Sequence, residues 1–174
     1  MSNESEYYQK SLLAEAAYAE LNDGLTSDQT AKLKESGLSD DQIAEFLQTW
    51  TNVNSYHSLL MGLRVNVFSN PETHEVCIAI AGTNSPLDII IPDSEIALGL
   101  KNSQYPGLSD FYESLIQDGV ITGSDHITAA GHSLGGFLAQ LLTLEYADIS
   151  ETYTYNSPGF GGIWSEIGEY LSAK

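Results

Sequence analysis

AAGHSLGGFLAQ, residues 129–140, is the stretch of this 174-residue sequence that decides the fold. It contains the pattern Gly-x-Ser-x-Gly, centred on Ser133, between an apolar segment typical of a strand and a segment with helical spacing of leucines. In this setting a serine occupies a tight, strained turn, and the flanking glycines remove Cβ atoms that would collide. Such a turn presents the hydroxyl as a nucleophile and leaves the next amide, that of Leu134, free to stabilise an oxyanion. A serine turn without chemistry is the alternative interpretation.

Strands and helices alternate on both sides of this turn. The segments expected to be strands are 63–67, 76–81, 126–131 and 152–156. The helices expected in this part of the chain are 107–118, 134–142 and roughly 163–172, and 83–106 reads as irregular. The first two strands form a hairpin, and the later strands, separated by helices, predict parallel pairing. The whole pattern indicates an α/β fold with three layers.

The first 60 residues are expected to form a helical part of the same domain. Residues 4–22 carry an apolar stripe at three-to-four spacing. GLTSDQ (24–29) and GLSDDQ (37–42) each place a serine before acidic residues, which is a typical helix start, so two short helices are expected. No linker rich in Pro, Gly or Ser divides the sequence. Residues 1–174 are therefore expected to be a single domain.

Charge and composition restrict the classes of function. The 24 acidic residues outweigh the 6 basic ones, and the net charge of −18 argues against nucleic-acid binding and against unaided docking on anionic lipid. No calcium-loop motif is found, so no calcium site is predicted. Chemistry at a serine nucleophile needs no metal or organic cofactor, and none is expected. Cys77 is expected to be a buried thiol.

The sequence leaves the cellular location open. No apolar run is long enough to predict a transmembrane segment. The polar start MSNESEYYQK has no apolar signal-peptide core, so we expect either a cytoplasmic protein or one exported through a signal elsewhere.

GHSLGGFLAQL, with AIAGTNSPLD upstream and YTYNSPGFGG downstream, resembles the class 3 lipase family of α/β-hydrolases. It is most similar to the lipase modules of bacterial calcium-repeat (RTX-type) proteins, which also carry an AAYA-type helix, here residues 16–19. The resemblance implies an α/β-hydrolase-like sandwich and an oxyanion hole completed by Thr83. The family usually has Arg where this chain has Ala81. The segment after this turn corresponds to a lid, although its isoleucines are equally suited to a core.

The sequence departs from the family pattern at the catalytic base. Its triad runs serine, acid, histidine, but no histidine follows Ser133. His132 is adjacent to the serine, His126 and His74 are expected to be structural or solvated, and only His57 could reach the site by an unusual path. The acidic residues after the serine are poorly placed for the triad: Glu145, Asp148, Glu151, Glu166 and Glu169. We interpret the chain as the amino-terminal part of a larger lipase module, truncated after the strand at 152–156.

Two functions remain open. The first is a carboxylic-ester hydrolase, a lipase or esterase acting on an acyl ester or lipid with Ser133, Leu134 and Thr83. Its isolated chain is expected to be nearly inactive, since loss of the base costs on the order of 10⁶ in turnover. The second is a non-catalytic binding or assembly module that retains the fold. Triacylglycerol, phospholipid and short esters all remain candidate substrates. An uncovered sheet edge also predicts self-association.

Overall fold

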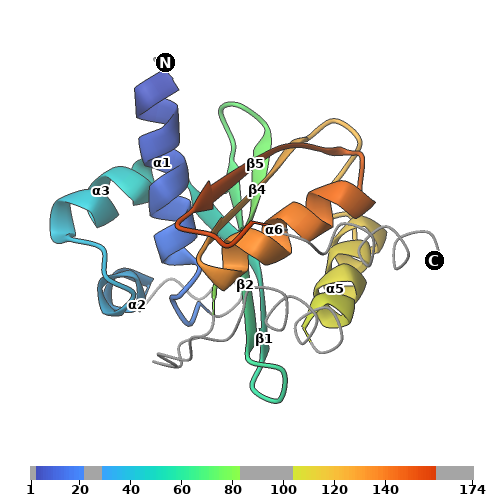
Figure 1. Cartoon of the computed structure of the whole chain (residues 1–174). Coiled ribbons are helices and arrows are strands. Elements are labelled where there is room, and N and C mark those ends of the chain that lie inside the picture. The colour runs from blue at the N-terminus through green and yellow to red at the C-terminus, as the bar shows by residue number, and fades with distance from the viewer. Residues whose placement is uncertain (1–2, 22–28, 83–103, 160–174) are drawn as a thin grey trace.

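The computed structural model describes residues 3–21, 29–82 and 104–159, and a five-stranded sheet lies at its centre (Figure 1). The strands follow the order β1 to β5 across the sheet: β1 (Thr51–Ser58), β2 (Leu63–Asn70), β3 (Glu75–Ile80), β4 (His126–His132) and β5 (Ile149–Tyr155). β1, β2 and β3 pair antiparallel, whereas β3, β4 and β5 pair parallel. The predicted hairpin and the predicted parallel strands are confirmed.

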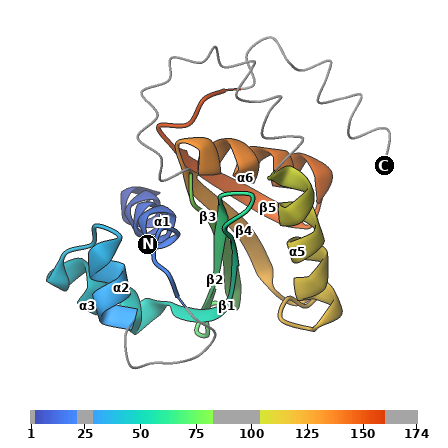
Figure 2. The ribbon, with the colours of Figure 1, turned by 90° about the horizontal axis from the view of Figure 1, so that it is seen from below.

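Helices cover both faces of this sheet, which gives the three expected layers (Figure 2). On one face lie α1 (Asn3–Ala16), α2 (Gln29–Glu35) and α3 (Asp40–Thr49), and on the other lie α5 (Tyr105–Gln117) and α6 (Leu134–Glu145). The helix expected at 163–172 and most of the irregular segment 83–106 lie outside the described residues.

The sheet has a separate core on each face, because successive side chains of a strand point in opposite directions. Val65, Ile78 and Ala129 pack with α5 and α6. Phe68 and Cys77 pack with α1, α2 and α3. Burial raises the pKa of the Cys77 thiol, which is fully enclosed. The prediction of a buried core thiol is confirmed.

The start signal at GLSDDQ forms as expected. The Ser39 hydroxyl accepts a hydrogen bond from the Gln42 amide at 3.3 Å, and the Ser39 amide donates to the Gln42 side chain at 2.9 Å. This reciprocal capping box satisfies two amides that a helix start otherwise leaves unpaired. The matching signal at GLTSDQ begins outside the described residues, and α2 follows it from Gln29.

The helical part is shorter than expected, because residues 51–58 form β1 at the edge of the sheet. The sequence TNVNSYHS is almost entirely polar and lacks the alternation that marks a half-buried strand. Pairing with β2 makes it a strand, with a register shift between Asn52 and Asn54 and a hydrogen bond of 3.3 Å from the Asn52 side chain to the Val67 carbonyl. His57, which lies in the part expected to be helical, is therefore on an edge strand of the described sheet.

A buried ion pair fixes α1 to the sheet. The Lys10 side chain is 3% exposed and pairs with Glu75 at the start of β3, and Glu75 also accepts a hydrogen bond of 2.8 Å from Thr128 on β4. The Lys10 ammonium lies 5.1 Å from the centre of the Trp50 ring and 5.3 Å from that of Tyr153. These contacts hold the helix against three different elements, and burial lowers the pKa of Lys10.

Replacing this lysine tests the contribution of the pair. We expect Lys10→Met to lower the free energy of unfolding by about 3 kcal/mol, because Glu75 would remain as a buried carboxylate without its cation. Lys34→Met is the matched control, since the pair of Lys34 and Asp40 is mostly exposed, and we expect it to cost less than about 1 kcal/mol. Urea unfolding measures both values. Equal stability of the two variants would contradict this role for Lys10.

Candidate active site

Ser133 occupies a strained turn between β4 and α6. Its backbone has φ 53° and ψ −125°, a region that residues with a side chain rarely adopt. The Ser133 amide donates to the Tyr155 carbonyl at 2.9 Å, and the Ser133 carbonyl accepts from the Gly136 amide at 3.0 Å. The serine thus stands at the first turn of α6, at the carboxyl end of a central parallel strand. This is the geometry that the Gly-x-Ser-x-Gly pattern predicts.

Three glycines permit this turn, because backbone atoms lie where their side chains would be. A Cβ on Gly135 would lie 2.0 Å from the Ile80 carbonyl oxygen. A Cβ on Gly131 would lie 2.4 Å from the Gly135 carbonyl carbon, and one on Gly136 would lie 2.9 Å from the Gly131 carbonyl oxygen. The first turn of α6 therefore rests directly on the ends of β3 and β4.

An added methyl group should separate these elements. We expect Gly135→Ala to lower the free energy of unfolding by about 3 kcal/mol, because the neighbouring atom is backbone and cannot rotate away. Gly123→Ala is the control, since no atom lies within 4 Å of its Cβ position. Thermal and urea unfolding of the two variants make the comparison. A Gly135→Ala chain within about 0.5 kcal/mol of Gly123→Ala would contradict the close contact.

The end of β3 runs beside the serine turn. A Cβ on Gly82 would lie 3.4 Å from the Leu134 amide nitrogen and 3.1 Å from the His132 carbonyl oxygen. Leu134 is the first residue of α6, where an amide has no acceptor within its own helix. The predicted oxyanion donor and the predicted oxyanion turn thus lie at one place. Thr83, the next residue of that turn, lies outside the described residues, so its role stays a prediction.

Tyr18 connects the two segments, and the sequence indicated it only as part of the AAYA pattern. Its hydroxyl accepts a hydrogen bond of 3.1 Å from the Gly82 amide. The same oxygen lies 3.3 Å from His132 Nδ1 and 3.5 Å from the His132 carbonyl oxygen. Burial raises the pKa of Tyr18, so the hydroxyl stays protonated at neutral pH. One phenol therefore contacts both the end of β3 and the residue before Ser133.

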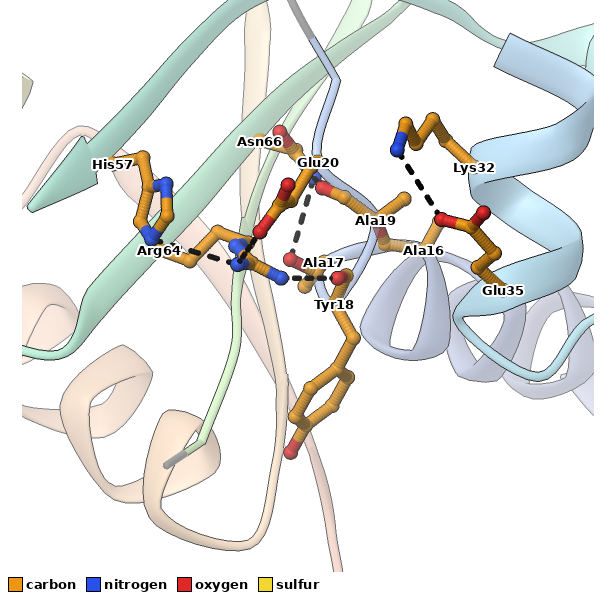
Figure 3. A network of polar contacts seen from close by, with 10 residues as sticks. All are labelled: Ala16, Ala17, Tyr18, Ala19, Glu20, Lys32, Glu35, His57, Arg64 and Asn66. Atoms are coloured by element: carbon orange, nitrogen blue, oxygen red, sulfur yellow. Dashed lines mark hydrogen bonds and ion pairs between the residues drawn. The ribbon is translucent and has the colours of Figure 1, made fainter. Parts of the chain in front are cut away.

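Two side chains of β2 fix the backbone that carries Tyr18 (Figure 3). Arg64 donates to the Tyr18 carbonyl and pairs with Glu20 at 2.7 Å. Asn66 donates to the carbonyls of Ala16 (3.0 Å), Ala17 (3.3 Å) and Ala19 (2.9 Å). The figure shows the Tyr18 ring extending away from this cluster. The turn after α1 is thus attached to the sheet through its own carbonyl groups, and the phenol is directed from a fixed base.

Removing the phenol oxygen tests this link. We expect Tyr18→Phe to lower the free energy of unfolding by about 1 kcal/mol and to speed hydrogen exchange of the Gly82 amide, which would lose its acceptor. Tyr8→Phe is the control, because Tyr8 is 42% exposed. Amide exchange followed by NMR measures the effect at Gly82. An unchanged exchange rate in Tyr18→Phe would contradict the link.

The histidines of the sequence lie away from the position of a base. His132 directs Nδ1 towards Tyr18, on the α1 face of the sheet. His57 lies on β1, three strands from β4, which is a lateral separation of about 14 Å. His74 is in the exposed β2–β3 turn and His126 begins β4, so both lie at the end of the strands opposite to the serine. The expectation that His74 is solvated is confirmed, and β1 gives His57 no path to the serine.

The described acidic residues after Ser133 also lie at the end of the sheet opposite to the serine. Glu145 ends α6, about 18 Å along the helix from the serine, and Asp148 and Glu151 lie around the start of β5. Each accepts a hydrogen bond from a tyrosine: Tyr105 to Glu145 (2.6 Å), Tyr112 to Asp148 (2.9 Å) and Tyr153 to Glu151. The three carboxylates therefore contact structural tyrosines and lie far from the serine. Glu166 and Glu169 lie outside the described residues.

Among residues 3–21, 29–82 and 104–159, no group of three or more His, Cys, Asp or Glu side chains is arranged to hold a metal ion. None of the helices in this part of the chain has the length and apolar character needed to cross a membrane.

Solved structures similar to this chain are fungal lipases. Lip2 lipase from Yarrowia lipolytica superposes with a TM-score of 0.60 at 19% identity, over 91% of this chain and 59% of that protein. Lipase II from Rhizopus niveus gives 0.64 at 16% identity, over 99% of this chain and 68% of the lipase. The lipase from Rhizopus microsporus var. chinensis gives 0.57 at 14% identity, over 97% and 63%. This chain thus spans about 60% of the length of Lip2.

At identities of 14–19%, the structural similarity to these lipases establishes the fold alone. The chain has the α/β-hydrolase fold of these lipases, as predicted. No protein-family model matches the sequence, and no curated protein matches it.

Proposed function

We propose that Ser133 is the nucleophile of a carboxylic-ester hydrolase, a lipase or esterase. The observation that carries the proposal is the strained backbone of Ser133 at the start of α6, with the Leu134 amide and the end of β3 beside it. A serine in a positive-φ turn above a parallel sheet is costly, and such strain is typical of nucleophile turns. The fungal lipases with the same fold support ester hydrolysis.

We infer a two-step reaction at this serine. The Ser133 oxygen attacks the ester carbonyl carbon, and the carbonyl oxygen becomes an oxyanion that accepts hydrogen bonds from Leu134 and from Thr83. The alcohol leaves with a proton, and water then releases the acid from the acyl-serine. The amino end of α6 adds a positive dipole at the oxyanion. The Tyr18 hydroxyl binds the end of β3 by accepting a hydrogen bond from the Gly82 amide.

The proposal assigns the base and the acid to polypeptide outside these 174 residues. No histidine of the sequence follows the serine, and those before it lie elsewhere in the fold. Within the described sheet β5 is an outer strand, and a groove of about 600 Å³ runs along it, lined by Glu6, Tyr7 and residues 151–155. We place the missing part of the module at this edge. Self-association through the same edge stays a prediction.

The family assignment is part of the proposal. The motifs around Ser133, Ala81 and residues 16–19 support membership of the class 3 lipases, and we propose a similarity to the lipase modules of RTX-type proteins. An acyl ester or lipid would then be the substrate. The alternative is a non-catalytic binding or assembly module. Its support is that no histidine follows Ser133 in the sequence and that Ala81 stands where the family usually has arginine.

Hydrolysis of p-nitrophenyl butyrate tests the proposal. We expect the 174-residue chain to hydrolyse the ester little faster than its Ser133→Ala variant. Added imidazole should raise the hydrolysis rate of the serine-containing chain above that of the variant measured with the same imidazole. A longer product of the same reading frame, with the acid and histidine present, should gain activity on the order of 10⁶-fold over the isolated chain.

Two results would decide against hydrolysis at this serine. One is full activity in the longer protein after Ser133→Ala. The other is no activity in any longer form although it carries a histidine after the serine, which would favour the binding module.

A further inference from the structure

Two adjacent leucines stand out on the surface of the described residues. Leu59 is 87% exposed and Leu60 is 98% exposed, at the turn between β1 and β2. Leu63, three residues further on, is fully buried. Single exposed apolar side chains are ordinary, but two neighbours that are both almost completely exposed are not.

This turn is fixed at its base. The Ser58 hydroxyl accepts from the Met61 amide at 3.3 Å, and Gly62 takes φ +63°, which suits a glycine. The Gln104 side chain, from a residue that is only 6% exposed, donates to the carbonyls of Met61 (2.7 Å) and Gly62 (3.3 Å). The start of α5 therefore supports the turn from beneath, and the two leucines project from an ordered support.

The β1–β2 turn lies at the same end of the strands as Ser133. One row of paired residues runs from Tyr56 through Val65 and Ile80 to Gly131. From this row β1 continues to Leu59 in the same direction in which β4 continues to the serine. β2 and β4 are two strands apart, about 10 Å. Figure 1 shows the β1–β2 turn extending beyond the rest of the described chain at this end.

The segment that contains this turn also lacks acidic residues. The chain has 24 acidic residues, yet none occurs in the 26 residues from 46 to 71, which is the longest acid-free run of the sequence. The nearest charged side chain after the two leucines is Arg64. The segment therefore lacks the negative charge that would oppose an approach to a lipid surface. The net charge of the whole chain, −18, favours a neutral or zwitterionic surface over an anionic one.

We propose that Leu59 and Leu60 insert into the surface of a zwitterionic or neutral lipid layer and hold the Ser133 edge of the sheet against it. A convex pair of leucines needs no matching pocket in acyl chains, whereas a protein partner would have to supply one. The inference rests on the proposed function for what happens at the surface, since the substrate would be an ester presented in a lipid layer. The attachment itself does not depend on hydrolysis.

Sedimentation of the full chain with phosphatidylcholine vesicles tests the attachment. We expect the wild type to bind, and to bind less to vesicles that also contain phosphatidylglycerol. The double variant Leu59→Ser/Leu60→Ser should bind at least about tenfold more weakly. Leu144→Ser is the matched control, because Leu144 is 45% exposed but lies near the end of α6, at the opposite edge of the sheet. It should bind like the wild type.

Three results would overturn the proposal: no binding of the wild type to phosphatidylcholine, equal binding by the double variant, or equal losses in the double variant and in Leu144→Ser. A wild-type dimer that the double variant dissociates, without vesicle binding, would make the leucines a protein contact instead. Ser133→Ala separates this proposal from the proposed function. Vesicle binding should survive in that variant, and it is measured whether or not any ester is cleaved.

Discussion

The first turn of α6 lies so close to the ends of β3 and β4 that no side chain fits between them. The Cβ position of Gly135 is 2.0 Å from the carbonyl oxygen of Ile80, so the helix can begin there only with glycine. This contact leaves the chain a single sharp turn from β4 into α6, and Ser133 carries the resulting strain at φ 53°. It also brings the first free amide of the helix beside Gly82. The position of the candidate site thus follows from a steric constraint of the sheet.

α1 and the turn after it connect this site to β2 and to the start of β3. Near its middle, Lys10 binds the start of β3 in a buried ion pair. Just after its end, Arg64 and Asn66 of β2 bind the backbone of the following turn, and Tyr18 extends from that turn to Gly82 and His132. α1 and the turn after it therefore contact both ends of β3. A displacement of α1 would therefore move the partner of Gly82 and of His132, the residue before Ser133.

Features with a local cause were predictable from the sequence, and those with a distant cause were not. The Gly-x-Ser-x-Gly pattern between a strand and a helix predicted the turn, and apolar runs predicted the hairpin and the parallel strands. The close contact of Gly135 with Ile80 of β3 has a distant partner and was not predictable from the pattern. The polar segment 51–58 gave no such signal, since pairing with β2 makes it a strand. The role of Tyr18 depends on partners 64 and 114 residues away. The support of the β1–β2 turn by Gln104 comes from a residue 42 and 43 positions away from its acceptors, which no pattern indicates.

Covalent trapping of the nucleophile is the most direct measurement of whether Ser133 acts with a base from outside this chain. A p-nitrophenyl phosphonate ester would be added to the 174-residue chain and to a longer product of its reading frame, and peptide mass spectrometry would locate the label. We expect rapid labelling of Ser133 in the longer protein and much slower labelling in the 174-residue chain, because the phosphonate reacts with an activated serine. Equally rapid labelling of both forms would place the base within these residues. Labelling at another residue would remove Ser133 from the chemistry.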